Sequence, residues 1–239
     1  VDSDDWIEPD MYEFLYHLLK ENGADISICS HYRDKGKKSV AKYSLGEQFV
    51  FTRDEGIRAL VVDRRIRNYV WDKLYKRRLF SGITFPLNRI FEDIAISYRI
   101  FYKAEKIVVR EFPKYHYVIR DGSAMQSKYD PLKEHNLFLS VYEQVYFVLE
   151  KGIWDQAPIY VLRRGIRLID HMSMLRPSSS TEGVIKDVLA KMHEFDDVSC
   201  CQLGLSLSLK RYFIFHYMSA YRKTYRFVRL ILKSKRHKF

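Results

Sequence analysis

The sequence of 239 residues has only three cysteines, ten glycines and six prolines. Cys29, Cys200 and Cys201 form neither an even set nor a spaced metal motif, and adjacent cysteines pair poorly, so we expect free thiols in a reducing compartment. We find no secretory leader, and the longest apolar runs are broken by Lys, Arg or His, so no transmembrane helix is predicted. No repeat or low-complexity segment occurs. With 47% hydrophobic residues, the chain is expected to bury one substantial core plus a smaller appendage.

Acidic residues are missing from the end of the chain. Residues 205–239 hold ten Lys or Arg and no Asp or Glu, so almost all of the net charge of +11 belongs to this tail. The spacing predicts a helix over about 205–233 with two opposite stripes. The basic stripe contains Arg222, Arg226, Arg229 and Lys233, and the other contains Phe213, Tyr217, Ala220, Thr224, Phe227, Val228 and Ile231.

Two interpretations of this tail helix remain open. A packed helix with a solvated charged face is one. The other is a helix that binds an anionic membrane surface, because basic and aromatic-rich amphipathic helices bind anionic headgroups. We expect the second, which predicts a cytoplasmic protein held peripherally at the inner face of the cell membrane. No nucleic-acid partner is expected, because no recognition motif accompanies the basic residues.

Carboxylates crowd the start of the chain. Asp2, Asp4 and Asp5 lie within four residues, directly before Trp6. Such carboxylates repel one another unless a hard divalent cation or a network of sugar hydroxyls takes up their charge and lone pairs. An acidic helix N-terminus is the alternative, since Asp and Glu favour the first turn. The context must decide between the two.

A second acidic pair, Glu92 and Asp93, stands before a predicted helix whose buried face carries Ile94, Tyr98 and Phe101. In the first turn, backbone N–H groups and the helix dipole are expected to keep both carboxylates ionised. For such a pair in isolation, helix capping is the stronger explanation, and the ordered set of motifs around it favours a catalytic role. Between the two acidic clusters lie W-D-K-L-Y-K-R at 71–77 and G-I-T-F-P at 82–86, and R-D-G-S follows at 120–123.

These segments, in this order, resemble the motifs of family 2 glycosyltransferases of the GT-A fold, in the form common among polysaccharide-building bacterial members. The resemblance covers residues 1 to about 127, and Asp72 stands where the family usually has Asn. It implies an inverting transferase that moves a hexose or N-acetylhexosamine from a nucleotide-diphosphate sugar to an acceptor hydroxyl, on a glycan or a lipid-linked acceptor, in cell-surface polysaccharide synthesis.

The resemblance also implies roles for individual residues. Asp93 is the catalytic base with Glu92 beside it, and Asp4, Asp2 and Asp5 serve the metal or the ribose. Mn²⁺ or Mg²⁺ fits such all-oxygen ligation. The substrate-binding residues that it implies are Trp6, Trp71, Lys73, Arg120 and Ser123. His116 is a candidate metal ligand, although a histidine on a Tyr-rich strand more often satisfies its hydrogen bonds inside the fold.

The predicted fold class is α/β, a truncated GT-A nucleotide-diphospho-sugar transferase domain over 1–127 followed by an all-helical region over 128–239. In the first part we expect a helix after Pro9, a strand over 25–32, a helix capped by Thr52 with Glu55, and two strands separated by Pro113. In the second part we expect helices over 136–149, 157–171 and 181–195 before the tail helix. The first residue is Val, so we expect it to be preceded by further βα units, which in the family hold the base and the ribose of the nucleotide sugar. Without these units we expect residues 1–239 not to turn over nucleotide sugars.

Three other functions remain open. A glycoside hydrolase also needs two carboxylates, but it needs no metal cluster and leaves the first acidic cluster unexplained. A nucleic-acid binder suits the tail without a supporting motif. A non-catalytic remnant, which acts as a membrane-surface or polyanion-binding module, is the strongest alternative, because the expected N-terminal units are not in the sequence.

Overall fold

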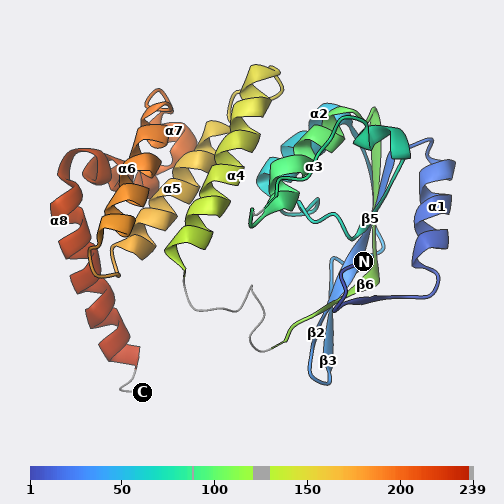
Figure 1. Ribbon diagram of the computed structural model, residues 1–239, viewed down its shortest axis with the longest axis horizontal. Helices are drawn as coiled ribbons and strands as arrows, with labels where there is room; N and C mark the ends of the chain where they lie inside the picture. The colour runs from blue at the N-terminus through green and yellow to red at the C-terminus, as the bar shows by residue number, and fades with distance from the viewer. Residues whose placement is uncertain (88, 121–129, 237–239) are drawn as a thin grey trace. The chain divides into compact units, whose positions relative to one another are not determined.

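The computed structural model describes residues 1–87, 89–120 and 130–236, with side chains described up to residue 232. The chain forms two compact units, Val1–Lys128 and Tyr129–Phe239. In the first unit a six-stranded sheet packs with helices, whereas the described part of the second unit contains helices without strands (Figure 1). The predicted mixed α/β class is therefore confirmed.

Two long strands form the centre of the sheet. Strand β2 (Ile26–Lys35) runs parallel to β6 (Lys106–Val118). The outer side of β6 pairs antiparallel with β4 (Gln48–Thr52) along its first half and with β1 (Trp6–Ile7) near its end. The outer side of β2 pairs antiparallel with β5 (Lys73–Tyr75) and then with β3 (Lys38–Lys42).

Strand β6 corrects one prediction, because Pro113 does not divide it into two strands. Proline lacks the N–H that a ladder needs, so it is tolerated only where no neighbour requires that donor. Pro113 lies between the β4 and β1 pairings on one side, and on the other side the register with β2 shifts around Ser30. The irregular register accommodates the proline within one continuous strand.

Helices cover both faces of this sheet. Helix α1 (Met11–Glu21) lies on one face, and α2 (Arg53–Val62) and α3 (Glu92–Tyr102) lie on the other (Figure 1). A short 3-10 helix, η1 (Arg77–Phe80), follows β5. The buried side chains under α1 include Met11, Leu15, Cys29 and Tyr115. The predicted capping box is confirmed, since the Thr52 N–H donates to Glu55 Oε2 (2.8 Å) and the Glu55 N–H donates to Thr52 Oγ1 (3.4 Å).

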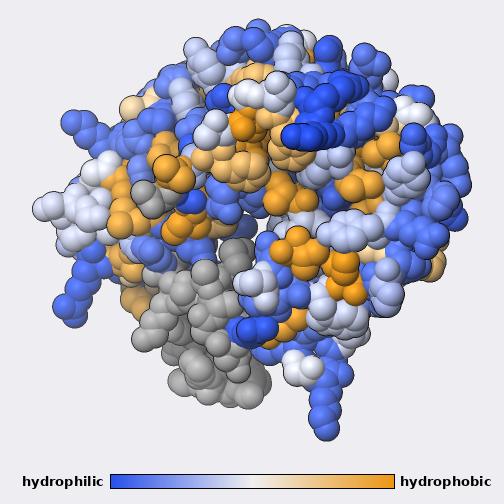
Figure 2. Space-filling view, turned by 45° about the vertical axis from the view of Figure 1, so that its right-hand side comes forward, coloured by the Kyte–Doolittle hydropathy of each residue, from blue (hydrophilic) through white to orange (hydrophobic). Residues whose placement is uncertain are grey.

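The second unit is built around α5 (Pro158–Met172), which packs against α4 (Pro131–Glu150), α6 (Ser179–His193), α7 (Cys200–Leu203) and α8 (Leu205–Arg236). Helix α8 includes the predicted tail helix, but Tyr217 has non-helical backbone angles (φ −139°, ψ 43°) that bend it. No described helix is both long and apolar enough to cross a membrane. All three cysteines are free thiols, with Cys29 buried. The surface carries patches of hydrophobic side chains between hydrophilic ones (Figure 2).

Candidate functional site

The acidic cluster forms a turn that leads into β1. The Asp5 N–H donates to the Asp2 carbonyl (3.1 Å), which closes the turn. Asp5 then uses both carboxylate oxygens within the protein: Tyr115 Oη donates to Oδ2 and the Val118 N–H donates to Oδ1, each at 2.8 Å. Burial raises the pKa of Asp5, although these two hydrogen bonds oppose the shift. Asp5 therefore attaches the turn to β6, and of the three predicted metal ligands it is the least available.

Asp2 and Asp4 keep exposed side chains, so they are the carboxylates of this turn that can face a ligand. Among the described residues, no three His, Cys, Asp or Glu side chains converge on a common point. Two exposed carboxylates fit Mg²⁺ or Mn²⁺ by their chemistry, because both ions prefer oxygen ligands and Mg²⁺ usually keeps waters or substrate oxygens in its shell. The residues present therefore fit such an ion only with further ligands from a phosphate and from water.

Arg120 lies beside this turn. Its Nη2 donates to the Asp4 carbonyl at 3.0 Å, and the residue is exposed. A guanidinium next to two exposed carboxylates suits a ligand that carries both a phosphate and a cation, because it can share the charge of the phosphate. Asp4 and Arg120 are thus brought together across a sequence separation of 116 residues. Ser123, the other residue predicted here, lies outside the described residues.

Trp6 does not stand alone at the edge of the sheet. Its ring stacks on His116 with centroids 3.4 Å apart, and Tyr32 also stacks on that imidazole, at 4.4 Å. The two ring nitrogens of His116 lie 2.8 Å from Asp34 Oδ2 and 3.1 Å from Glu8 Oε1. His116 is therefore satisfied by protein partners, which supports the structural interpretation over metal ligation. Trp6 remains half exposed on top of this stack.

Trp71 lies at the centre of an aromatic cluster that the sequence interpretation did not foresee. Its ring stacks on Tyr69 at 4.6 Å and on Tyr115 at 4.1 Å, and Tyr117 lies parallel at 6.0 Å. Burial, followed by the charge of Asp5, raises the pKa of Tyr117. The alternation of Tyr115 and Tyr117 along a strand was the available signal, because residues two apart point to the same face. The cluster joins Trp71 to the acidic turn.

Lys73 was predicted to bind substrate, but its side chain is fully buried. The ammonium donates to the carbonyls of Arg67 (3.0 Å) and Tyr69 (2.5 Å) and to the Asp72 carboxylate. Burial raises the pKa of Asp72, and the charge of Lys73 opposes that shift. In this structure Lys73 therefore supports the loop that carries Trp71, and its donors face the protein.

Asp93 lies in the first turn of α3, as predicted, but burial overrides the expected effect of that turn. Its Oδ1 accepts the Ile94 N–H at 2.7 Å. Desolvation nevertheless raises the pKa of Asp93 to about 6, and the charges of Glu92 and Asp63 add to the increase. Glu92 itself is exposed. Asp63, which no motif indicated, therefore tunes the candidate base from the end of α2.

The backbone around Asp93 is unusual. Phe91 and Asp63 both adopt left-handed φ angles, 65° and 52°. Each such non-glycine conformation costs of order 1–3 kcal/mol and tends to occur at functional sites. Asp93 is thus a half-buried carboxylate with a raised pKa, and such perturbed groups occur often at functional sites.

Comparisons with known proteins show what the chain resembles in sequence and fold. No protein-family model matches the chain. The glycosyltransferases GlyA and GlyG of Streptococcus pneumoniae are each 30% identical to it, over 52% and 54% of this chain and 19% and 46% of their own lengths. The chain thus spans less than half the length of these relatives. The crystal structure of S. aureus TarS 1–349 in complex with UDP-GlcNAc is 20% identical and matches 100% of this chain and 67% of its own, with a TM-score of 0.61. In sequence and fold the chain is therefore related to glycosyltransferases.

Proposed function

We propose that this chain forms the catalytic part of a family 2 glycosyltransferase of the GT-A type, which transfers a hexose or N-acetylhexosamine from a nucleotide-diphosphate sugar to an acceptor hydroxyl with inversion. The observation that most supports the proposal is the raised pKa of Asp93. A carboxylate with a pKa of about 6 is largely ionised near neutral pH and still accepts a proton readily, which is what a general base requires. Similarity to GlyA and GlyG supports the same assignment.

The donor side of the site is assigned to the acidic turn. Asp2 and Asp4 would hold a Mn²⁺ or Mg²⁺ ion together with the donor diphosphate, and Arg120 would bind the diphosphate from the side. Such an ion would supply neutralisation of the charge that develops on the departing diphosphate. TarS was crystallised with UDP-GlcNAc, so UDP-GlcNAc is the first donor to test for this chain.

The acceptor side is assigned to the aromatic cluster and Asp93. Aromatic faces such as those of Trp6 and Trp71 bind the apolar faces of sugar rings through their large, rigid surfaces. The charge of Lys73 acts on Asp93, and the Lys73 ammonium also donates to the Tyr69 carbonyl in the loop that carries Trp71. Lys73 therefore interacts with both the proposed base and the loop of the aromatic cluster. A glycan or lipid-linked acceptor in cell-surface polysaccharide synthesis fits this arrangement.

The reaction is a single displacement. Asp93 removes the proton of the acceptor hydroxyl while that oxygen forms a bond to the anomeric carbon of the donor. The bond from the anomeric carbon to the β-phosphate oxygen breaks, and the nucleoside diphosphate leaves with the electron pair. Attack opposite to the leaving group inverts the anomeric configuration.

Product analysis tests this proposal. The protein, with any residues that precede Val1, is incubated with Mn²⁺, UDP-GlcNAc, UDP-glucose or UDP-galactose, and an oligosaccharide acceptor. We expect one donor to give a product whose anomeric configuration, measured by NMR, is the inverse of that of the donor. Arg120→Gln should weaken donor binding, whereas Arg64→Gln, which changes another exposed arginine of the same unit, should not. Retention of configuration, or hydrolysis without transfer, would overturn the proposal.

A further inference from the structure

Helix α8 turns its apolar side outward. Phe213, Tyr217, Phe227, Val228 and Ile231, which the sequence places on one stripe, are each at least 41% exposed in the structure. Leu230 and Leu232 add 54% and 51% exposure on the same part of the helix. Scattered exposed apolar residues are ordinary, but a continuous row of large ones marks an interaction surface.

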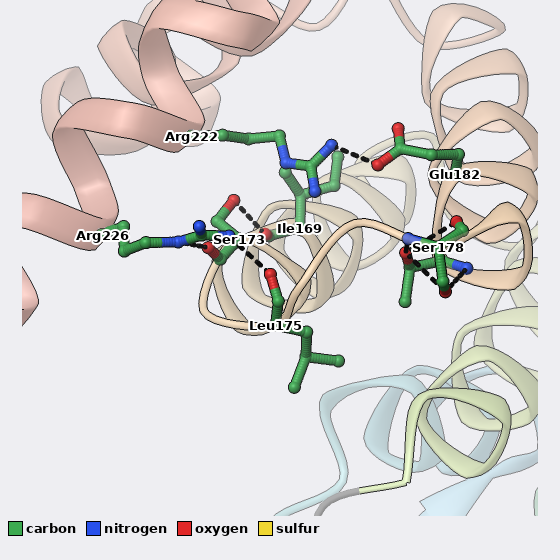
Figure 3. Close-up of polar contacts among 8 residues, drawn as sticks. Ile169, Ser173, Leu175, Ser178, Glu182, Arg222 and Arg226 are labelled. Carbon is green, nitrogen blue, oxygen red and sulfur yellow. Dashed lines mark hydrogen bonds and ion pairs between the residues drawn. The ribbon is translucent and has the colours of Figure 1, made fainter.

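Two residues of the basic stripe, Arg222 and Arg226, instead face the helical unit, whereas Arg229 is exposed. Arg222 Nη1 lies 2.7 Å from Glu182 Oε1 on α6. Arg226, one turn later, donates from Nε to the Ser173 carbonyl (3.0 Å) and from Nη2 to the Leu175 carbonyl. Figure 3 shows Arg226 directed from α8 toward the segment that joins α5 and α6, and Arg222 directed toward Glu182 on α6. These contacts hold α8 in an orientation that leaves its apolar stripe uncovered within the unit.

A groove of about 460 Å³ opens beside the two arginines. It is lined by Pro177, Ser219, Arg222, Lys223, Arg226, Phe227 and Leu230. Three cations and one nearby carboxylate, Glu182, leave a local excess of positive charge. Arg222 Nη2 is buried without a hydrogen-bond partner among the described residues, which is costly unless an acceptor binds. The groove thus places cationic side chains beside an apolar wall.

Charge decides which partner fits this surface. Residues 205–239 carry ten basic and no acidic residues, so two copies of this tail repel each other and self-association is disfavoured. A nucleic acid offers the negative charge but no apolar partner for Phe227 and Leu230. An anionic lipid offers both, because a phosphate headgroup lies next to acyl chains.

We propose that the part of α8 that follows the bend at Tyr217 lies on an anionic lipid surface. A headgroup phosphate binds the exposed ammonium of Lys223, while Phe227 and Leu230 enter the region of the acyl chains. The exposed Arg229 adds charge at the same surface. This contact holds the chain peripherally at the inner face of the cell membrane, and it requires neither a donor nor a metal ion, so it is independent of the proposed transferase activity.

Vesicle sedimentation tests the proposal with the intact chain. Vesicles of phosphatidylglycerol and phosphatidylcholine should retain the protein, vesicles of phosphatidylcholine alone should not, and retention should fall steeply as salt is raised. Lys223→Gln should weaken partitioning about fivefold, the worth of one basic residue at an anionic surface. Phe227→Ser with Leu230→Ser should weaken it at least about tenfold, because two apolar side chains no longer enter the membrane. Arg222 and Arg226 are left unchanged because they hold the helix in place.

The matched control is Leu132→Ser with Lys186→Gln, which removes one exposed apolar and one exposed basic residue from other helices of the unit. It should partition within about twofold of the unchanged chain. The proposal is overturned if anionic vesicles fail to retain the protein at low salt, or if the Phe227 and Leu230 substitutions leave retention unchanged. It is also overturned if those substitutions convert a dimer into a monomer without vesicles, since a second copy then covers the stripe.

Discussion

Trp71 lies against Tyr115 with ring centroids 4.1 Å apart and planes inclined by 21°. Tyr115 also donates its hydroxyl to Asp5, so one stack joins the loop that carries Trp71 to the acidic turn at the start of the chain. This aromatic contact therefore links the two parts of the candidate site.

Removal of the Trp71 ring should consequently destabilise the first unit. Aromatic-to-alanine changes in packed surroundings cost about 3–5 kcal/mol, and Trp71 is half-buried, so we expect about 2–4 kcal/mol for Trp71→Ala. Trp71→Phe keeps a stacked ring and should cost less. Tyr12→Ala, at an exposed aromatic position of the same unit, should change the free energy of unfolding by less than about 0.5 kcal/mol. Urea titration measures all three, and equal losses for Trp71→Ala and Tyr12→Ala would contradict the account.

Substitutions of the adjacent residues Asp4 and Asp5 should have different effects, one on ligand binding and the other on the free energy of unfolding. Asp4→Ala should abolish binding of Mn²⁺ that depends on a uridine diphosphate sugar, while the free energy of unfolding stays unchanged, because its side chain is exposed. Asp5→Ala should cost about 1–3 kcal/mol, because the Tyr115 hydroxyl and the Val118 N–H lose their acceptor. Calorimetry of ligand binding and of unfolding distinguishes the two effects, and the opposite pattern would reverse our assignment of Asp4 and Asp5.

The Asp72 and Lys73 pair should behave as a buried ion pair. Lys73→Met leaves the Asp72 carboxylate buried without its cation, and breaking such a pair by removing one partner costs about 3–5 kcal/mol. Asp72→Asn combined with Lys73→Met removes both charges and should recover much of that loss. If a double-mutant cycle in urea shows no coupling between the two positions, the buried pair does not support this loop.

The stability of the protein should also depend on Asp93 through pH. Its pKa is about 6 in the folded chain against an ordinary value of 3.8, so the folded state binds the proton more tightly. The free energy of unfolding therefore falls as pH rises from about 4 to about 6. Asp93→Asn has no carboxylate to ionise at this position. At pH 7.5 the variant should therefore be more stable than the unchanged chain, by about 1–3 kcal/mol when solvent screening is not counted. At pH 4 it should not be more stable. If urea titration gives the unchanged chain and Asp93→Asn the same unfolding midpoint at pH 7.5 as well as at pH 4, the pKa of Asp93 is not raised.

The elements that the sequence could predict were those with strong local signals. The spacing of apolar residues located α1 and the helices of the second unit, and Thr52 with Glu55 marked the start of α2. Pro113 led to a wrong division of β6, because a local rule for proline ignores whether a neighbouring strand needs the missing donor. Whether a proline ends a strand thus depends on the pairing of that strand with neighbours that are distant in sequence.

The roles of individual side chains were harder to predict for the same reason. Asp5 and Tyr115 are 110 residues apart, so nothing local indicates that this carboxylate is used within the fold. The direction of Lys73 depends on carbonyls that a loop brings around it. The basic stripe of α8 was recognised by its spacing, but a helical period does not reveal which of two stripes faces the protein. Arg222 and Arg226 show that part of the charged stripe does.

The most direct test of the central claim is the rate of sugar transfer by the Asp93→Asn variant of the protein, with any residues that precede Val1. Asparagine keeps the size and position of the side chain but cannot accept the proton, so turnover should fall by at least about a hundredfold while donor affinity survives. Asp54→Asn, in the first turn of α2, is the matched control and should keep normal turnover. In the unchanged protein, turnover should rise with pH through about 6 as Asp93 ionises. Near-normal turnover by Asp93→Asn would contradict the assignment of Asp93 as the base.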